Sequence, residues 1–170
     1  MREATGDIWS MLTDGDAIII TTNGILNTEG RLVMGKGIAL EAKTRVKGVD
    51  RIAGDMVGRY GNHAWLLDPA HMTPRWDMIF MPVKEHWRDP ADLALIERSA
   101  HEIVKIVAQE IHIGGVWAED HPDYVRLPNI YLPHVGCGAG SLNWSDVKPV
   151  LDAIFTDDRY VAVAREVESR

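Results

Sequence analysis

The feature that most constrains the fold is a continuous apolar run at residues 17–20, an alanine followed by three isoleucines. A short β-branched run of this kind is typical of a strand buried on both faces, as in a parallel sheet covered by helices. Gly15 and Asp16 give a turn signal before the run, and two threonines and an asparagine follow it. We therefore expect the sheet to be built around a central strand at residues 17–22.

Strand and helix patterns alternate along the rest of the chain. Strands are predicted at residues 2–8, 64–67, 77–82, 129–133 and 160–164, and helices at residues 36–46, 52–60, 90–111 and 144–155. For the longest helix, Asp89 is the expected N-cap, Pro90 the first helical residue, and Gly114-Gly115 the end. Loops are predicted at 68–75 and 112–127. The alternation favours one α/β domain over residues 1–170, with three layers (α/β/α) and a mixed, mostly parallel central sheet.

The composition argues against several classes of protein. A formal net charge of −7 disfavours a general polynucleotide binder, although it permits recognition of a single nucleotide. One cysteine excludes an internal disulfide and favours a reducing cytoplasm. No apolar run approaches the roughly 18 residues of a membrane span, and the N-terminus lacks the pattern of a secretory signal. We expect a cytoplasmic monomer that does not engage a membrane.

Two glycine-rich segments, residues 23–37 and 136–141, follow predicted strands. Gly35 and Gly37 let the backbone approach a ligand, and the start of the following helix favours an anion. Because ligands of open α/β sheets bind beyond the carboxyl ends of strands, two such loops are expected to clamp a diphosphate between them. Each loop alone is also consistent with a tight turn, and neither matches the P-loop or the dinucleotide-binding fingerprint.

Three segments carry a resemblance to a known family: TNG at 22–24 with MGKGIA at 34–39, MPVKEHWR at 81–88, and LPHVGCG at 132–138 with LNW at 142–144. In this order, they resemble the macrodomain family of ADP-ribose-binding modules. The closest similarity is to its ADP-ribosyl glycohydrolase branch, which includes antitoxins that strip ADP-ribose from DNA bases and the human terminal ADP-ribose protein glycohydrolase. The resemblance suggests a bacterial or bacteriophage stand-alone protein. It implies ADP-ribose as ligand or product, ADP-ribosylated DNA or protein as partner, and no cofactor.

The resemblance places a catalytic lysine at Lys84. A lysine can attack the open-chain aldehyde of the sugar or act as an acid or base if burial lowers its pKa; the alternative is a solvated lysine beside Glu85. Asn23 and Asn27 are candidates for contact with the distal ribose. We prefer Asn27 for that catalytic contact and Asn23 for loop structure, although the loop after Asn27 is longer than in the antitoxins.

The residues expected to bind ADP-ribose are Asp7, Ile8, Asn23, Met34, Gly35, Gly37, Ile38, Trp87, Val135, Gly136, Cys137, Gly138, Ala139 and Gly140. Three of them have a second interpretation. Asp7 is either a partner of adenine or a helix N-cap, and Cys137 is either a ligand contact or a small buried thiol. Trp87, with His86 beside it, either lines the distal ribose or an attached base, or packs in the core. The human enzyme has a catalytic aspartate where Gly140 stands in this chain. The absence of that aspartate here favours the lysine mechanism.

Four functions remain open at this point. The first is hydrolysis of ADP-ribose from a nucleobase or protein side chain, which we favour. The others are a non-catalytic ADP-ribose reader, an ADP-ribose 1″-phosphate phosphatase, and an unrelated α/β nucleotide binder. We expect no metal, because His112, His121 and His134 do not form a metal-ligand spacing with cysteine or carboxylate residues.

Overall fold

The computed structural model describes residues 1–67, 76–118 and 127–166. Within these ranges the sheet contains six strands in the order β1-β6-β5-β2-β4-β3. Their bounds are Arg2–Thr5 (β1), Ala17–Thr22 (β2), Trp65–Leu67 (β3), Asp77–Pro82 (β4), Ile130–Pro133 (β5) and Tyr160–Ala164 (β6). Neighbouring strands are parallel except for the antiparallel pair β3 and β4. The predicted mixed, mostly parallel sheet is therefore confirmed.

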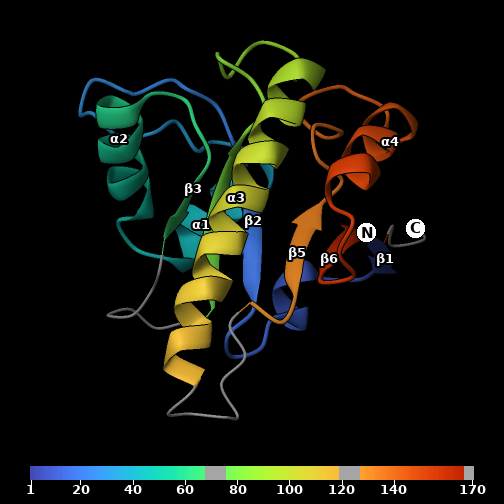
Figure 1. Cartoon of the computed structure of the whole chain (residues 1–170). Coiled ribbons are helices and arrows are strands. Elements are labelled where there is room, and N and C mark those ends of the chain that lie inside the picture. Colours follow the sequence, from blue (N-terminus) through green and yellow to red (C-terminus); the bar gives the residue numbers. More distant parts are fainter. Residues whose placement is uncertain (68–75, 119–126, 167–170) are drawn as a thin grey trace.

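Helices cover both faces of this sheet (Figure 1). They are α1 (Gly37–Arg45), α2 (Val49–Tyr60), α3 (Leu93–Ala118) and α4 (Trp144–Ile154), and a short 3-10 helix, η1, spans Ile8–Met11. No helix in the described part of the chain is long and apolar enough to cross a membrane. The arrangement gives the three layers predicted from the sequence.

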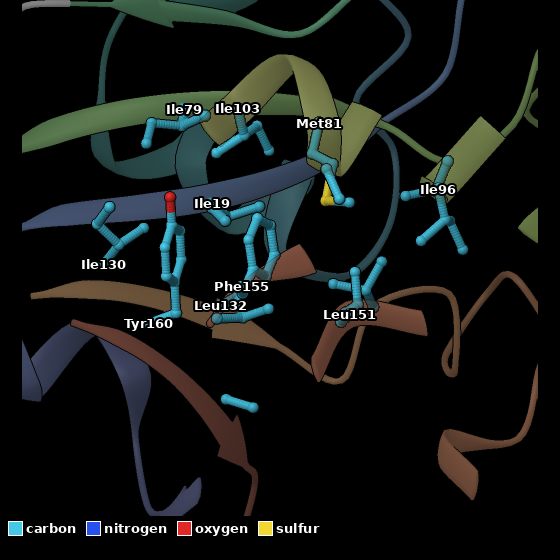
Figure 2. Close-up of a cluster of buried hydrophobic side chains, with 14 of the residues drawn as sticks. Ile19, Ile79, Met81, Ile96, Ile103, Ile130, Leu132, Leu151, Phe155 and Tyr160 are labelled. Atoms are coloured by element: carbon cyan, nitrogen blue, oxygen red, sulfur yellow. The ribbon is translucent and has the colours of Figure 1, made fainter. Parts of the chain in front are cut away.

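Strand β2 contributes to a hydrophobic core on each side of the sheet. Ile19 packs into the cluster that contains Ile103 of α3 and Leu151 of α4, and Figure 2 shows these three side chains together. Ile18 and Ile20 point the other way, into the cluster beneath α1 and α2. All three isoleucines of the strand are fully buried, which confirms the prediction from the apolar run, since alternate residues of a strand face opposite sides.

The ends of the longest helix differ from the prediction. The helix begins at Leu93, and its cap is Asp92, whose carboxylate accepts a hydrogen bond from the Ala94 N–H at 2.9 Å. Asp89 and Pro90 belong instead to the loop before the helix. At the other end the helix passes through Gly114-Gly115 to Ala118, because interior glycine costs only about 1 kcal/mol relative to alanine. The predicted loop at 112–127 is thus wrong up to residue 118, and 68–75 and 119–126 lie outside the described residues.

Helix α2 packs directly on the first glycine-rich segment. A Cβ at Gly54 would lie 2.1 Å from the carbonyl oxygen of Gly30, whereas a Cβ at Gly58, one turn later, would meet only Leu26 at 3.7 Å. We expect Gly54→Ala to destabilise the protein by about 1–3 kcal/mol through overpacking, and Gly58→Ala to stabilise it by about 0.5–1 kcal/mol through reduced chain entropy. Urea unfolding of the two variants beside the wild type measures both changes in the free energy of unfolding. Similar changes for both variants would contradict the close packing of Gly54 on the loop.

Candidate functional site

A cavity of about 950 Å³ opens beyond the carboxyl ends of the central strands. This volume lies at the upper end of the range for small-molecule sites. The lining residues include Thr22 and Asn23 after β2, Val83 and Lys84 after β4, Pro133 and His134 at the end of β5, and Val163, Ala164 and Arg165 at the end of β6. Both glycine-rich segments contribute as well, with Gly35, Lys36 and Gly37 from the first and Gly136, Gly138, Ala139 and Gly140 from the second. The two predicted loops therefore face one cavity.

Asn23 holds the first loop in place. Its Nδ2 donates to the Val33 carbonyl at 2.8 Å, and its Oδ1 accepts from the Ile25 N–H at 3.0 Å. The loop is thereby closed onto the end of β2, and Gly35 and Gly37 reach the cavity. No side chain caps the N-terminus of α1. The first amides of this helix are accordingly suited to bind an anion.

The second loop is a compact turn that depends on its glycines. Gly136 has φ of +74°, a conformation that residues with a Cβ rarely adopt. The Leu142 N–H donates to the Gly136 carbonyl at 3.0 Å, and the Ala91 N–H donates to the Gly140 carbonyl at 2.8 Å. A Cβ at Gly140 would lie 2.4 Å from the Gly136 oxygen. A side chain at position 140 is therefore incompatible with this turn.

Lys84 is buried, with 8% of its surface exposed, and lines the cavity. Its Nζ donates to the Asp89 carbonyl at 2.8 Å, the Ala139 carbonyl at 2.9 Å and the Trp87 carbonyl at 3.4 Å. Burial lowers the pKa of its ammonium, against an opposing effect of the Asp89 carboxylate. The alternative of a solvated surface lysine is wrong. Because an ammonium has three donors, Lys84 can donate a hydrogen bond to a substrate only if it loses its hydrogen bond to one of these carbonyls.

Asn27 and Asp7 lie outside the lining of this cavity. The Oδ1 of Asn27 accepts from the Glu29 and Arg31 N–H groups at 2.9 and 3.0 Å, which places it at the tip of a turn. Asn23 lines the cavity, but both of its amide atoms are committed to contacts within the loop, which agrees with the structural role that we preferred for it. A contact between Asn27 and the distal ribose stays a prediction. Asp7 is the N-cap of η1. The hydrogen bond that its carboxylate accepts from the Ser10 hydroxyl lowers the pKa of Asp7. The interpretation of Asp7 as a helix N-cap therefore agrees with the structure.

The other predicted binding residues divide into lining and core. Ile8, Ile38 and Trp87 line the cavity, whereas Met34 and Val135 are buried in the two hydrophobic clusters. The Cys137 thiol lies 3.3 Å from the Val135 carbonyl oxygen, and burial raises its pKa. A raised pKa makes the thiol a weak nucleophile near neutral pH.

Trp87 is 44% exposed, so its interpretation as core is wrong. The guanidinium of Arg88 lies 4.6 Å from the centre of its ring, and the His86 ring stacks beside it with centroids 5.5 Å apart. Cation–π and ring contacts of this kind hold the indole in place. An aromatic surface therefore stands at the edge of the cavity, close in sequence to Lys84.

Several lining residues were not predicted from the sequence. Those with ionisable side chains are Lys36, Glu41, Arg88, His134 and Arg165. Lys36, Arg88 and His134 lie inside segments that carried the resemblance, which is a signal that could have found them. Arg165 and Glu41 form an ion pair between the end of β6 and α1, and only the sheet order brings them together. Burial lowers the pKa of His134, whose ring stacks on Trp144 at 4.1 Å.

The charge of the cavity is opposite to that of the chain. Four cationic side chains and one carboxylate line it, in a protein of formal net charge −7. Such a concentration of positive charge in a concave site favours an anionic ligand. Among the described residues, no group of three or more histidine, cysteine or acidic side chains is arranged to hold a metal ion; His112 and His121 lie outside the side chains that the structure describes.

Curated proteins similar in sequence to this chain share one name. No protein-family model matches the chain. It is 26% identical over 146 residues to a DNA ADP-ribosyl glycohydrolase of Mycobacterium tuberculosis, covering 83% of this chain and 37% of that protein. It is 30% identical over 132 residues to the enzyme of the same name from Thermus aquaticus, covering 72% of this chain and 30% of that protein. The chain thus spans about a third of the length of these relatives.

Solved structures share the fold. The macrodomain of Mycobacterium tuberculosis DarG superposes with a TM-score of 0.70 at 24% identity, covering 99% of this chain and 97% of that one. Thermosipho africanus DarTG in complex with ADP-ribose gives a TM-score of 0.72 at 21% identity, over 99% of this chain and 43% of that one. The structural similarity extends over nearly the whole chain.

Proposed function

This chain belongs to the macrodomain family, and on that premise we propose that it is an ADP-ribosyl glycohydrolase that releases ADP-ribose from a modified nucleobase. The observation that carries the proposal is the amine of Lys84, held 2.9 Å from the Ala139 carbonyl of the second glycine-rich loop and at the wall of the cavity. The names of the relatives, both DNA ADP-ribosyl glycohydrolases, support the same reaction.

The parts of ADP-ribose match distinct regions of the cavity in this proposal. The diphosphate lies between the N-terminus of α1 and the second loop, where amide groups and the excess of cationic side chains favour it. The adenosine end lies against the apolar side chains Ile8, Ile38 and Val163. The distal ribose then reaches the wall that carries Asn23 and Lys84. Each region supplies the chemistry that its part of the ligand requires.

The reaction breaks the bond between the anomeric carbon and the acceptor. Water supplies a hydroxyl group to that carbon, and the acceptor leaves with a proton. Lys84 can take one of two roles. In the first, its neutral amine attacks the anomeric carbon of the opened sugar, the acceptor leaves with a proton, and water hydrolyses the resulting lysine imine to give ADP-ribose and the free amine. In the second, its ammonium donates the proton to the leaving acceptor while water attacks the carbon, and the amine is reprotonated from solvent. In either role Lys84 exchanges one of its three carbonyl partners for the substrate.

An exposed aromatic surface beside the amine supports a planar acceptor. Trp87 and the guanidinium of Arg88 are stacked at the edge of the cavity, and bases stack readily on aromatic side chains. A nucleobase next to the distal ribose would make this contact, whereas a carboxylate side chain of a protein gains little from it. The single cysteine also supports a cytoplasmic location.

Two measurements on the wild-type protein test the proposal. Calorimetric titration is expected to show tighter binding of ADP-ribose than of AMP or NAD, and parallel hydrolysis assays are expected to show release of ADP-ribose from modified DNA faster than from modified protein. A preference for AMP or NAD would indicate a different nucleotide site. Binding without release from either substrate would identify a reader, and release of phosphate from ADP-ribose 1″-phosphate alone would identify the phosphatase.

A further inference from the structure

The segment that carries Lys84 is held by four donors from three parts of the chain: the loop after β2, the connection between α2 and β3, and the beginning of α3. Residues 82–85 leave the end of β4, and each of their carbonyls accepts a hydrogen bond. The donors are the Ser99 hydroxyl to Pro82 at 2.8 Å, the Asp92 N–H to Val83 at 2.8 Å and the Gly24 N–H to Glu85 at 2.9 Å, and the Asn62 side-chain amide to Lys84 at 3.1 Å. Only Ser99 and Asn62 donate through a side chain.

Asn62 donates directly to the backbone of the lysine itself. It lies in the connection between α2 and β3, 22 residues before Lys84 in the sequence. The same Nδ2 also donates to the Glu85 carboxylate at 2.9 Å. One amide group therefore holds both the main chain of Lys84 and the side chain that follows it.

Asn62 is itself held between neighbouring elements through its side chain and its main chain. The backbone of Gly24 packs against it so closely that a Cβ at Gly24 would lie 2.9 Å from the Asn62 Cγ. The guanidinium of Arg98 on α3 donates to the main-chain carbonyl of Asn62, and Arg98 also pairs with Glu102 at 3.6 Å. Asn62 thus connects the loop after β2, the segment after β4 and helix α3.

We propose that Asn62 is a positioning residue that aligns the Lys84 amine for the reaction. This inference rests on the proposed function. The Nζ of Lys84 bonds carbonyls of its own segment and of the second loop at the same time, which requires a defined position of its backbone. Without the Asn62 donor, the Lys84 carbonyl loses its partner and the peptide turns to find another. Asn62 is not among the residues that line the cavity, so it acts through the lysine and not on the ligand.

The variant Asn62→Ala is expected to lower kcat for ADP-ribose release by about 10- to 100-fold, because a displacement of about 1 Å in a reacting group has an effect of that order. The KM for substrate and the dissociation constant for ADP-ribose are expected to stay within about twofold, since the binding loops are unchanged. Glu85→Ala is the matched control: it removes the second acceptor of the same amide and leaves the Lys84 bond, so kcat is expected to change little. An unchanged kcat in Asn62→Ala, or equal losses of affinity and kcat, would overturn the proposal.

A second measurement decides the proposal without relying on hydrolysis. Lys84 is expected to react slowly with an amine-acylating reagent in the wild type, because it is buried and hydrogen-bonded. Asn62→Ala is expected to raise its labelling rate severalfold, while the exposed Lys36 on the same cavity serves as internal reference. Equal labelling of Lys84 in both proteins would contradict the positioning role. If the wild type releases no ADP-ribose, the proposed function fails, and the labelling rates still test the placement of Lys84.

Discussion

Replacing Lys84 with alanine is expected to lower the rate of ADP-ribose release by about 10²- to 10⁴-fold, the range that one acid, base or nucleophile contributes. The variant loses the amine that lines the cavity and spans the segment after β4 and the second loop. Single-turnover hydrolysis of ADP-ribosylated DNA measures the chemical step directly. A variant that releases ADP-ribose as fast as the wild type would show that the reaction does not use this lysine.

Measuring ADP-ribose binding to Lys84→Ala distinguishes loss of the catalytic amine from damage to the binding site. The Ala139 carbonyl loses its ammonium partner in this variant, so the second loop becomes less constrained. We expect ADP-ribose binding to weaken by about tenfold at most, the equivalent of one hydrogen bond. Lys84→Arg is the matched control, because arginine keeps the positive charge and the donors but does not give up its proton. It is expected to bind ADP-ribose and to hydrolyse poorly.

The pH dependence of release distinguishes the two roles of Lys84. Burial lowers its pKa from the ordinary lysine value, so the neutral amine forms at a lower pH than in a solvated lysine. If the neutral amine attacks the sugar, kcat rises as the pH increases through this lowered pKa. If the ammonium donates a proton to the acceptor, kcat falls over the same interval. The measurement is the pH profile of kcat for the wild type and for the residual activity of Lys84→Arg. A rise or fall that is present in the wild type and absent from the variant assigns the corresponding role to Lys84.

Gly140→Ala is expected to weaken ADP-ribose binding by about 10- to 100-fold, because overpacking of about 1–3 kcal/mol must be relieved in the loop that binds the ligand. The new Cβ would lie 2.4 Å from the Gly136 oxygen and 2.7 Å from the Ala91 Cβ. Backbone atoms on one side and the segment before α3 on the other leave it no space. Calorimetric titration with ADP-ribose measures the loss.

Gly138→Ala gives the matched control for the stability of this loop. No atom lies within 4 Å of a Cβ at that position, so its unfolding midpoint is expected to match the wild type, whereas that of Gly140→Ala falls. Gly140→Asp, which introduces the residue type of the human enzyme, is expected to lose binding as Gly140→Ala does. Retained affinity in the aspartate variant would mean that the loop accommodates a side chain, contrary to the contacts that surround Gly140.

The sheet and its two ligand-facing loops follow from local sequence patterns. The isoleucines of β2 predict a strand with both faces buried because alternate residues must face opposite sides. Glycine-rich segments after β2 and β5 predict a site at the carboxyl ends because parallel strands end at one edge. Such inferences need only neighbouring residues, and the structure agrees with them.

Contacts between distant segments required the tertiary structure. The sequence favoured Asn27 over Asn23 for the distal ribose, but the Oδ1 of Asn27 closes a turn and this residue lies outside the lining of the cavity. Likewise Asp89 resembled a helix cap, yet its carbonyl is a partner of Lys84 and Asp92 caps the helix. A residue type alone predicts several hydrogen bonds of similar energy, and packing selects among them.

The sequence by itself determined the fold class, the central strand and the position of Lys84 after β4, because hydrophobic periodicity and turn residues act over short distances. Only the tertiary structure decided that this lysine is buried against three carbonyls, that Asn62 holds its backbone and that Arg165 joins the cavity. These features depend on which strands are neighbours and how the helices pack on them. That information lies in long-range contacts, which no single stretch of sequence contains.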